Sequence, residues 1–184
     1  MNFTKAVEHY AAFMHEVGIP VSPHSKDTPR RVVKMYGEYT EGLRPPTFKF
    51  TSFPKNPRHT YDQLVVVSPI SFGSLCAHHH VPFVGACHVG YLPSKRIIGL
   101  SKIVRAVTWI SRKPSIQEDL TEEIADLLMM ELKPRAVLVM MIATHYCIEM
   151  RGAEKAGVKT TTHCIRGRLR LSLKNEFIQT VRKD

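Results

Sequence analysis

Two short segments of the sequence carry the residue types from which a catalytic metal site can be built. Cys76 and His79 stand three positions apart in the segment CAHHH, and Cys147 follows in the later segment THYC. Thiolate sulfur and imidazole nitrogen are ligands that zinc prefers, and C-x-x-H is a usual half-site spacing. Three protein ligands leave a fourth position for water, as in a catalytic rather than a structural zinc site. The sequence therefore predicts a catalytic Zn²⁺ held by Cys76, His79 and Cys147.

Two further histidines flank the predicted ligands. His78 and His145 would lie beside the metal without binding it, and would be free to move protons. The alternative is structural, because a free Cys is usually a small buried hydrophobe and a run of His can be a surface cluster. Cys87 and Cys164 are expected to be of that structural kind.

Length and composition indicate an ordinary globular protein. The chain has 184 residues, of which 43% are hydrophobic and 23% charged. We expect a helical appendage over residues 1–45 and one catalytic domain over residues 46–184. The N-terminus has no signal-peptide pattern, no stretch approaches the roughly 18 apolar residues of a membrane span, and four Cys without such a signal favour a reducing compartment. The expected location is therefore the cytoplasm, without a membrane partner.

The net charge of +10 favours a polyanionic partner. No RNA-binding signature and no zinc-finger spacing is present, so nucleic acid is not expected. We favour a phosphorylated small molecule as the partner; the alternative is that the charge serves solubility alone.

Apolar periodicity and capping signals predict five helices. The first spans residues 3–17. Asp27 is expected to cap the second, which has a proline in its first turn and runs to about Gly42. The other three are expected from Gly99 to the break at Pro114, from a capping box at Ser115–Glu118 to about Leu132, and over residues 174–182.

Short apolar or alternating runs predict strands, listed by residue number as 64–67, 83–91, 96–98, 136–143, 159–162 and 165–173. Gly73 and Ser74 are expected to form a turn before the metal loop, and residues 44–60 another loop. Because successive strands are close in sequence, most pairing should be antiparallel. The two middle helices would cover one sheet face, and a partner subunit is the simplest cover for the other. This is an α+β arrangement.

The segments named above, taken together, resemble those of the GTP cyclohydrolase I family. The resemblance runs from DTPRRV at residues 27–32 to the C-terminus. It is carried, in the family's order and at nearly its spacing, by HHVPFVG (79–85), GLSK (99–102), QE (117–118), THYC (144–147) and MRG (150–152).

The resemblance implies the tunnelling fold, with two helices on one face of a four-stranded antiparallel sheet and N-terminal helices. Subunits would join their sheets into a pentameric β-barrel, and two barrels would stack as a homodecamer with active sites at subunit interfaces. The implied reaction, part of pterin biosynthesis, converts GTP and water to 7,8-dihydroneopterin triphosphate and formate by opening the guanine imidazole ring. The resemblance assigns proton transfer in this reaction to His78 and His145.

Two adjacent residues are candidates for binding the guanine. Glu118 resembles the carboxylate that accepts hydrogen bonds from the base in the family, and Gln117 would lie beside it. The alternative is that Glu118 only completes the capping box begun by Ser115.

The triphosphate has its own candidates in Ser101, Lys102 and Arg105. They fall in the first turns of a predicted helix, and Lys102 and Arg105 share a face. A helix N-terminus bearing two cations suits a triphosphate, although a solvated basic face is the alternative. The resemblance implies that Arg151 is another phosphate contact and that Ser101 assists at the ribose ring oxygen.

One residue of the metal segment departs from the family pattern. Ala77 stands where the family has Glu, and loss of a carboxylate that orients a metal ligand typically costs about 10- to 100-fold in affinity or activity. Glu149 is a conceivable substitute. Two alternatives to the full reaction follow: a variant cyclohydrolase with a ring-opened or other purine product, or a catalytically weakened nucleotide-binding oligomer.

Overall fold

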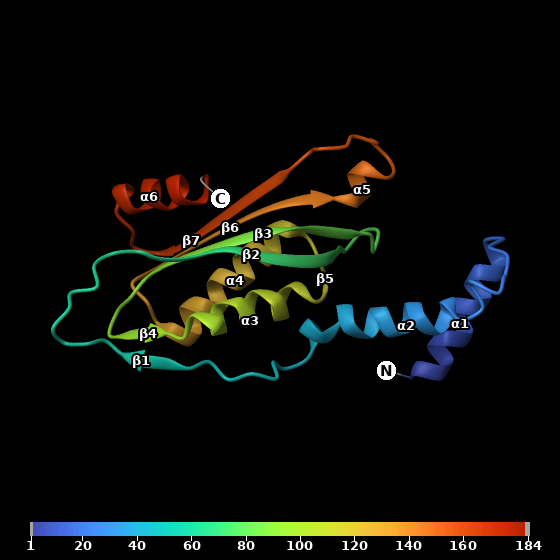
Figure 1. Ribbon diagram of the computed structural model, residues 1–184, viewed down its shortest axis with the longest axis horizontal. Helices are drawn as coiled ribbons and strands as arrows, with labels where there is room; N and C mark the ends of the chain where they lie inside the picture. The colour runs from blue at the N-terminus through green and yellow to red at the C-terminus, as the bar shows by residue number, and fades with distance from the viewer. Residues whose placement is uncertain (1, 183–184) are drawn as a thin grey trace.

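A computed structural model of the chain describes residues 2–182 and shows an α+β fold (Figure 1). The helices are α1 (Phe3–Glu16), α2 (Thr28–Tyr39), α3 (Leu100–Ser111), α4 (Gln117–Leu132), α5 (Tyr146–Glu149) and α6 (Leu171–Val181), with the 3₁₀ turn η1 (Glu41–Leu43). The strands are β1 (Ser52–Pro54), β2 (Val65–Cys76), β3 (Pro82–Leu92), β4 (Arg96–Ile98), β5 (Pro114–Ser115), β6 (Ala136–His145) and β7 (Thr160–Gly167). The α+β class expected from the sequence is confirmed.

The main sheet has the strand order β5-β2-β3-β6-β7. The long strands β2, β3, β6 and β7 pair antiparallel, whereas the short β5 runs parallel to the end of β2. Strands β1 and β4 form a separate two-stranded ladder. The end of β2, the start of β3 and the end of β6 consequently lie side by side at one end of the sheet.

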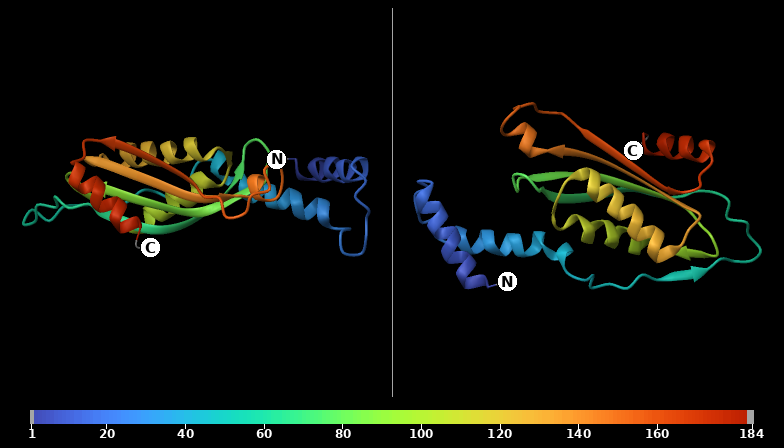
Figure 2. Two further views of the ribbon diagram at one scale, coloured as in Figure 1. Left: turned by 90° about the horizontal axis from the view of Figure 1, so that it is seen from above. Right: turned by 180° about the vertical axis from the view of Figure 1, so that it is seen from behind.

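Helices α3 and α4 cover one face of the sheet, as Figure 2 shows from behind. Alternate side chains of β3 and β6 point into this layer because successive residues of a strand face opposite sides. The residues that these two strands contribute to this core are Phe83, Cys87, Val89, Tyr91, Val137, Val139, Met141 and Ala143. The strands that carry the metal segments are therefore anchored in the main core.

The opposite face of the sheet is covered in part by α6. Phe177 and Val181 of this helix pack with Leu64, Leu92 and Leu138 in a second buried cluster. Full burial of a Phe side chain stabilises a fold by about 1.5–3 kcal/mol. The sequence predicts a partner subunit as the simplest cover for this face, whereas the chain folds its own C-terminal helix onto part of it.

The segment before the metal loop is a strand and not the turn expected at Gly73 and Ser74. These two residues pair with Val84 and Phe83 of β3, and the Ser74 hydroxyl donates to the carbonyl of Lys113. Small polar residues favour turns locally, but the continuous ladder with β3 overrides that preference.

The C-terminal part of the chain also differs from its prediction. Residues 159–162 and 165–173 were expected as strand, but β7 is one strand that ends at Gly167. Gly167 has φ +80°, and a Cβ there would lie 2.3 Å from the carbonyl oxygen of Arg135. The chain therefore turns out of the sheet at this residue, and α6 begins at Leu171 rather than at Lys174.

Two smaller corrections concern the N-terminal part. Helix α2 ends at Tyr39 rather than near Gly42, and the expected loop at 44–60 contains β1. Helix α1 packs on α2, and both project from the body of the molecule (Figures 1 and 2). Within residues 2–182, every helix is too short or too polar to cross a lipid bilayer.

Candidate functional site

The three predicted metal ligands come together at one end of the sheet. Cys76 is the last residue of β2, His79 lies in the turn that follows, and Cys147 lies in α5 directly after β6. One ligand atom of each residue lies within 4.8 Å of the other two. Cys76 is buried, Cys147 is half-buried and His79 is exposed, so the group opens toward solvent on one side.

The turn that carries His79 is closed by backbone hydrogen bonds. The Cys76 carbonyl accepts from the N–H groups of His79 and His80, and the Cys76 N–H donates to Val81. His80 has φ +52°, a left-handed conformation uncommon outside glycine. Its ring contacts the ring of Tyr36 on α2, at 5.7 Å between centroids. The turn that carries His79 therefore contacts helix α2.

The donor set of this group fits zinc. Two thiol sulfurs and one imidazole nitrogen are soft or borderline ligands, which select zinc over magnesium or calcium. In the metal-free chain, burial and the neighbouring Cys76 thiol raise the pKa of Cys147, while the positive charge of Arg151 opposes that shift. A bound cation would stabilise the ionised form of these thiols, so metal binding there would release protons.

His145 lies beside this group at the end of β6. Its ring is stacked on that of Phe83, and its Nε2 lies 2.8 Å from Oε1 of Gln117. Burial lowers the pKa of His145, and the negative charge of Glu118 opposes this shift. Glu118 is thus close enough to influence the imidazole electrostatically.

Gln117 is buried, with a relative exposure of 1%. Its Nε2 lies 3.1 Å from each of three acceptors, the carbonyl oxygens of Met141 and Thr160 and the hydroxyl of Thr162. The amide therefore joins α4 to β6 and β7. A contact of this side chain with substrate remains a prediction from the sequence.

The capping box expected at Ser115–Glu118 is not formed. Helix α4 begins at Gln117, its N-cap residue is Ile116, and no side chain caps it. Ser115 instead pairs with Cys76 in β5, and its hydroxyl donates to the carbonyl of Ile116. The carboxylate of Glu118 is exposed and makes no hydrogen bond or ion pair within residues 2–182, so it is available to a ligand.

His78 and Ala77 lie in the same turn as His79. Nδ1 of His78 is 3.8 Å from Sγ of Cys76, and the side chains of His78 and Ala77 are exposed. The backbone N–H of Ala77 donates to the carbonyl of Ser115, which ties the turn to the start of α4. Oε1 of Glu149, the conceivable substitute for the missing carboxylate, accepts from the N–H of Gly157 at 2.8 Å.

The predicted triphosphate residues divide into two groups. Arg151 follows α5 and acts electrostatically on Cys147. Ser101, Lys102 and Arg105 instead lie in the N-terminal half of α3, whose C-terminal end leads into β5 beside Cys76. A helix rises about 1.5 Å per residue, so the first turn of α3 begins roughly 15 Å from the metal end. Within one chain these three residues do not join the metal group.

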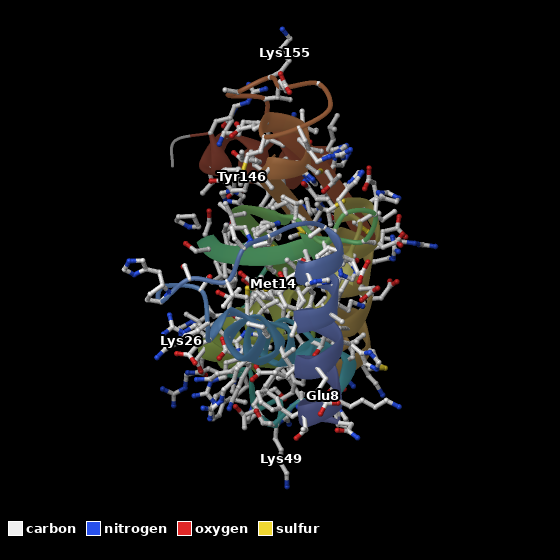
Figure 3. The ribbon with its side chains drawn as sticks, turned by 90° about the vertical axis from the view of Figure 1, so that its right-hand side faces the viewer. Glu8, Met14, Lys26, Lys49, Tyr146 and Lys155 are labelled. Atoms are coloured by element: carbon white, nitrogen blue, oxygen red, sulfur yellow. The ribbon has the colours of Figure 1, made fainter. Side chains whose placement is uncertain are left out.

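Several residues around the site were not singled out from the sequence. Phe83 stacks on His145, Thr121 and Thr162 contact Gln117, and Nζ of Lys159 donates to the Thr144 hydroxyl at 2.5 Å. Lys159 ends the loop 150–159, from which Lys155 projects outward beyond Tyr146 of α5 (Figure 3). Apart from the i, i+4 contact of Thr121 with Gln117 within α4, these contacts join segments that are distant in the sequence, so local patterns could not have found them.

Comparisons with known proteins place the chain among GTP cyclohydrolases. The family model for GTP cyclohydrolase I matches residues 6–182. A GTP cyclohydrolase 1 from Streptococcus pyogenes serotype M1 is 46% identical over 162 residues, covering 86% of this chain and 82% of that protein. A GTP cyclohydrolase 1 from Hydrogenobaculum sp. (strain Y04AAS1) is 38% identical over 182 residues, covering 97% of each.

Among solved structures, the apo crystal structure of the archaeosine synthase QueF-Like is similar to this chain with a TM-score of 0.49 and 16% identity. The match covers 100% of that protein's chain and 63% of this chain. The family match extends over nearly all described residues and includes every predicted site residue. The chain belongs to the GTP cyclohydrolase I family of enzymes.

Proposed function

We propose that this protein is a zinc-dependent GTP cyclohydrolase that converts GTP to 7,8-dihydroneopterin triphosphate and formate. The observation that carries the proposal is the convergence of the Cys76, His79 and Cys147 ligand atoms within 4.8 Å, in a chain of the GTP cyclohydrolase I family. When bound there, zinc supplies a Lewis acid that lowers the pKa of water and so provides a nucleophile near neutral pH.

The residues around the metal group are suited to hold and protonate the base. Glu118 presents an exposed carboxylate, which can accept hydrogen bonds from the N1 and N2 hydrogens of guanine. Burial lowers the pKa of His145, which favours the neutral imidazole that can accept a proton. His78, exposed beside Cys76, is the second proton carrier.

The separation of the triphosphate residues from the metal end supports a site made by more than one chain. In the proposed homodecamer, edge strand β7 of each subunit pairs with the sheet of the next to close a pentameric barrel, and two barrels stack. Ser101, Lys102 and Arg105 of a neighbouring copy then complete the site, with Arg151 of the first chain. The helix N-terminus adds its own favourable field for phosphate.

The test is turnover of GTP by the zinc-loaded protein, with formate and the pterin measured separately. Release of both, abolished by a chelator and restored by zinc, supports the proposal. Cys147→Ser is the matched control, since it removes one sulfur ligand and should lose both metal and activity. Absence of both products at every metal loading would exclude cyclohydrolase activity.

A second candidate is favoured by Ala77, which leaves the metal turn without the family carboxylate. The reaction would then stop at a ring-opened or formylated purine nucleotide, which mass spectrometry of the products detects. The Ala77→Glu variant should restore the pterin in that case. If dihydroneopterin triphosphate is the sole product of the unmodified chain, this candidate is excluded.

A further inference from the structure

We propose that Gln117 is a positioning residue that holds His145 in the Nε2–H tautomer, so that Nδ1 is the ring nitrogen that exchanges protons with the substrate. The inference rests on the proposed function in so far as it gives His145 a role in proton transfer. It differs from the sequence prediction, in which the Gln117 side chain binds substrate.

The contacts of Gln117 determine the orientation of its side-chain amide. Its Nε2 lies 3.1 Å from the carbonyl oxygens of Met141 and Thr160. A carbonyl oxygen can only accept, so both contacts require the NH₂ group at this position. The opposite orientation would set the amide oxygen against two other oxygens in a buried place.

A closed ring of hydrogen bonds through Thr121 and Thr162 fixes the same orientation of the amide independently. The Thr121 hydroxyl lies 2.7 Å from the backbone carbonyl oxygen of Gln117, to which it donates its single proton. Thr162 must then donate across the 2.6 Å contact to Thr121. The oxygen of Thr162 is left to accept from Nε2 of Gln117 at 3.1 Å. Each of the two hydroxyl protons makes one hydrogen bond. With the amide in the opposite orientation, its oxygen would face the Thr162 oxygen without a hydrogen between them.

The orientation of the Gln117 amide determines the tautomer of the His145 imidazole. Because Oε1 of Gln117 can only accept, Nε2 of His145 at 2.8 Å must carry the hydrogen and donate it. In the neutral ring the lone pair then belongs to Nδ1, which makes no hydrogen bond within residues 2–182. The ring of Phe83, parallel to within 3°, stacks on the imidazole and favours the plane in which this hydrogen bond is made.

The hydrogen bonds of the Gln117 amide leave none of its polar atoms for the substrate. The two hydrogens of Nε2 face three acceptors, and Oε1 is taken by His145. With a relative exposure of 1%, the side chain offers no free donor to a guanine. Holding the correct His tautomer is worth a large factor in proton-transfer enzymes, about 10⁴ in kcat in one serine protease.

The direct test is nitrogen NMR of the zinc-loaded protein with ¹⁵N-labelled histidine. The His145 signals are assigned by their absence from the His145→Gln variant. We expect a protonated Nε2 and an unprotonated Nδ1 in the neutral ring. An Nδ1–H tautomer in the unmodified chain would overturn the inference, and this measurement needs no variant at residue 117 to fold.

Kinetics give a second test. Gln117→Leu should lower kcat for GTP by about 10- to 100-fold while KM and zinc content stay within about twofold. Thr162→Val removes one of the three Nε2 contacts and should lower kcat by a smaller factor. A rise in KM with kcat preserved in Gln117→Leu would instead show substrate binding by the amide and contradict the inference.

The two proposals fail in different ways. If the zinc-loaded protein turns over no GTP, the proposed function fails, while the tautomer of His145 remains measurable. If GTP is turned over but His145 is the Nδ1–H tautomer, the role of Gln117 fails alone.

Discussion

The rings of Phe83 and His145 lie parallel, with centroids 4.6 Å apart and 3° between their planes. The two residues are direct cross-strand partners, one at the start of β3 and the other at the end of β6. Phe83 is fully buried and also touches the ring of Phe72, so it connects the core to the site. The orientation of a candidate proton carrier is therefore set by a residue of the core.

Replacement of Phe83 should affect stability and activity together. Phe83→Ala removes a fully buried ring and is expected to cost about 3–5 kcal/mol of unfolding free energy. Phe83→Leu keeps most of the volume but loses the stacking, worth about 0.5–1.5 kcal/mol. We expect Phe83→Leu to remain folded with a reduced kcat, measured by chemical denaturation and GTP turnover. Unchanged kcat in Phe83→Leu would show that the stacking has no part in positioning His145.

Glu118 provides a test that separates a cap from a ligand. Because α4 has no side-chain cap, Glu118→Gln should leave the free energy of unfolding within about 0.5 kcal/mol, as for an exposed surface residue. Loss of its carboxylate should raise KM for GTP strongly. Asp119→Asn, one position along the same exposed turn, is the matched control and should leave KM unchanged. A loss of stability of about 1 kcal/mol or more with KM intact would indicate a capping role instead.

Mixed oligomers test whether two chains build one site. Lys102→Ala and Cys147→Ser should each be inactive when assembled alone. If the two residues meet only across an interface, refolding the variants together should restore activity. The active sites would be those that combine the intact Cys147 of one chain with the intact Lys102 of its neighbour. The recovered activity is measured against mixing ratio, with Cys76→Ala plus Cys147→Ser as the control pair, since these residues lie in one ligand group. Equal behaviour of the two pairs would contradict a shared site.

Alkaline pH should destabilise the fold through two buried groups. Burial raises the pKa of Cys87 above its ordinary value of 9.0. Burial also raises the pKa of Tyr91 from 10.0, although a hydrogen bond with the backbone of Ile98 opposes the shift. Both groups are neutral in the folded chain and ionise more easily when it unfolds. Their contribution to the free energy of unfolding is complete below about pH 9 and is lost as pH rises. The free energy of unfolding then falls by about 1.4 kcal/mol per pH unit for each ionising group.

The measurement for this prediction is the unfolding free energy between pH 7 and 11. Cys87→Ala should make the decline above pH 9 shallower by the slope of one group. In the native protein, Cys87 should also resist alkylation, followed by mass spectrometry, until the chain unfolds. Rapid alkylation of Cys87 at pH 8 would be inconsistent with its burial.

Much of the site could be predicted from residue types and spacing. Cys76, His79 and Cys147 were recognisable because thiolate and imidazole are the ligands that zinc prefers and C-x-x-H is a usual half-site spacing. Long elements such as α1, α4 and β6 were predictable from apolar periodicity, which reflects burial of one face or one stretch.

Other features depend on contacts between distant segments. Ser115 is a residue type that favours an N-cap, yet it pairs with Cys76 as part of β5, so α4 begins later. Gly73 and Ser74 have the sequence of a turn, yet the ladder with β3 holds them in a strand. In both cases a partner far along the chain competes with the local preference and wins.

The sequence alone determined the chemistry available to this protein: two sulfurs and an imidazole for a metal, histidines for protons, and a carboxylate for a base. The tertiary structure decided how these groups are used. It freed Glu118 from a capping role, buried Gln117 against His145, and set Lys102 a helix length away from the metal ligands. The reason is physical, since residue types define which bonds are possible, whereas burial and register decide which partners are within reach.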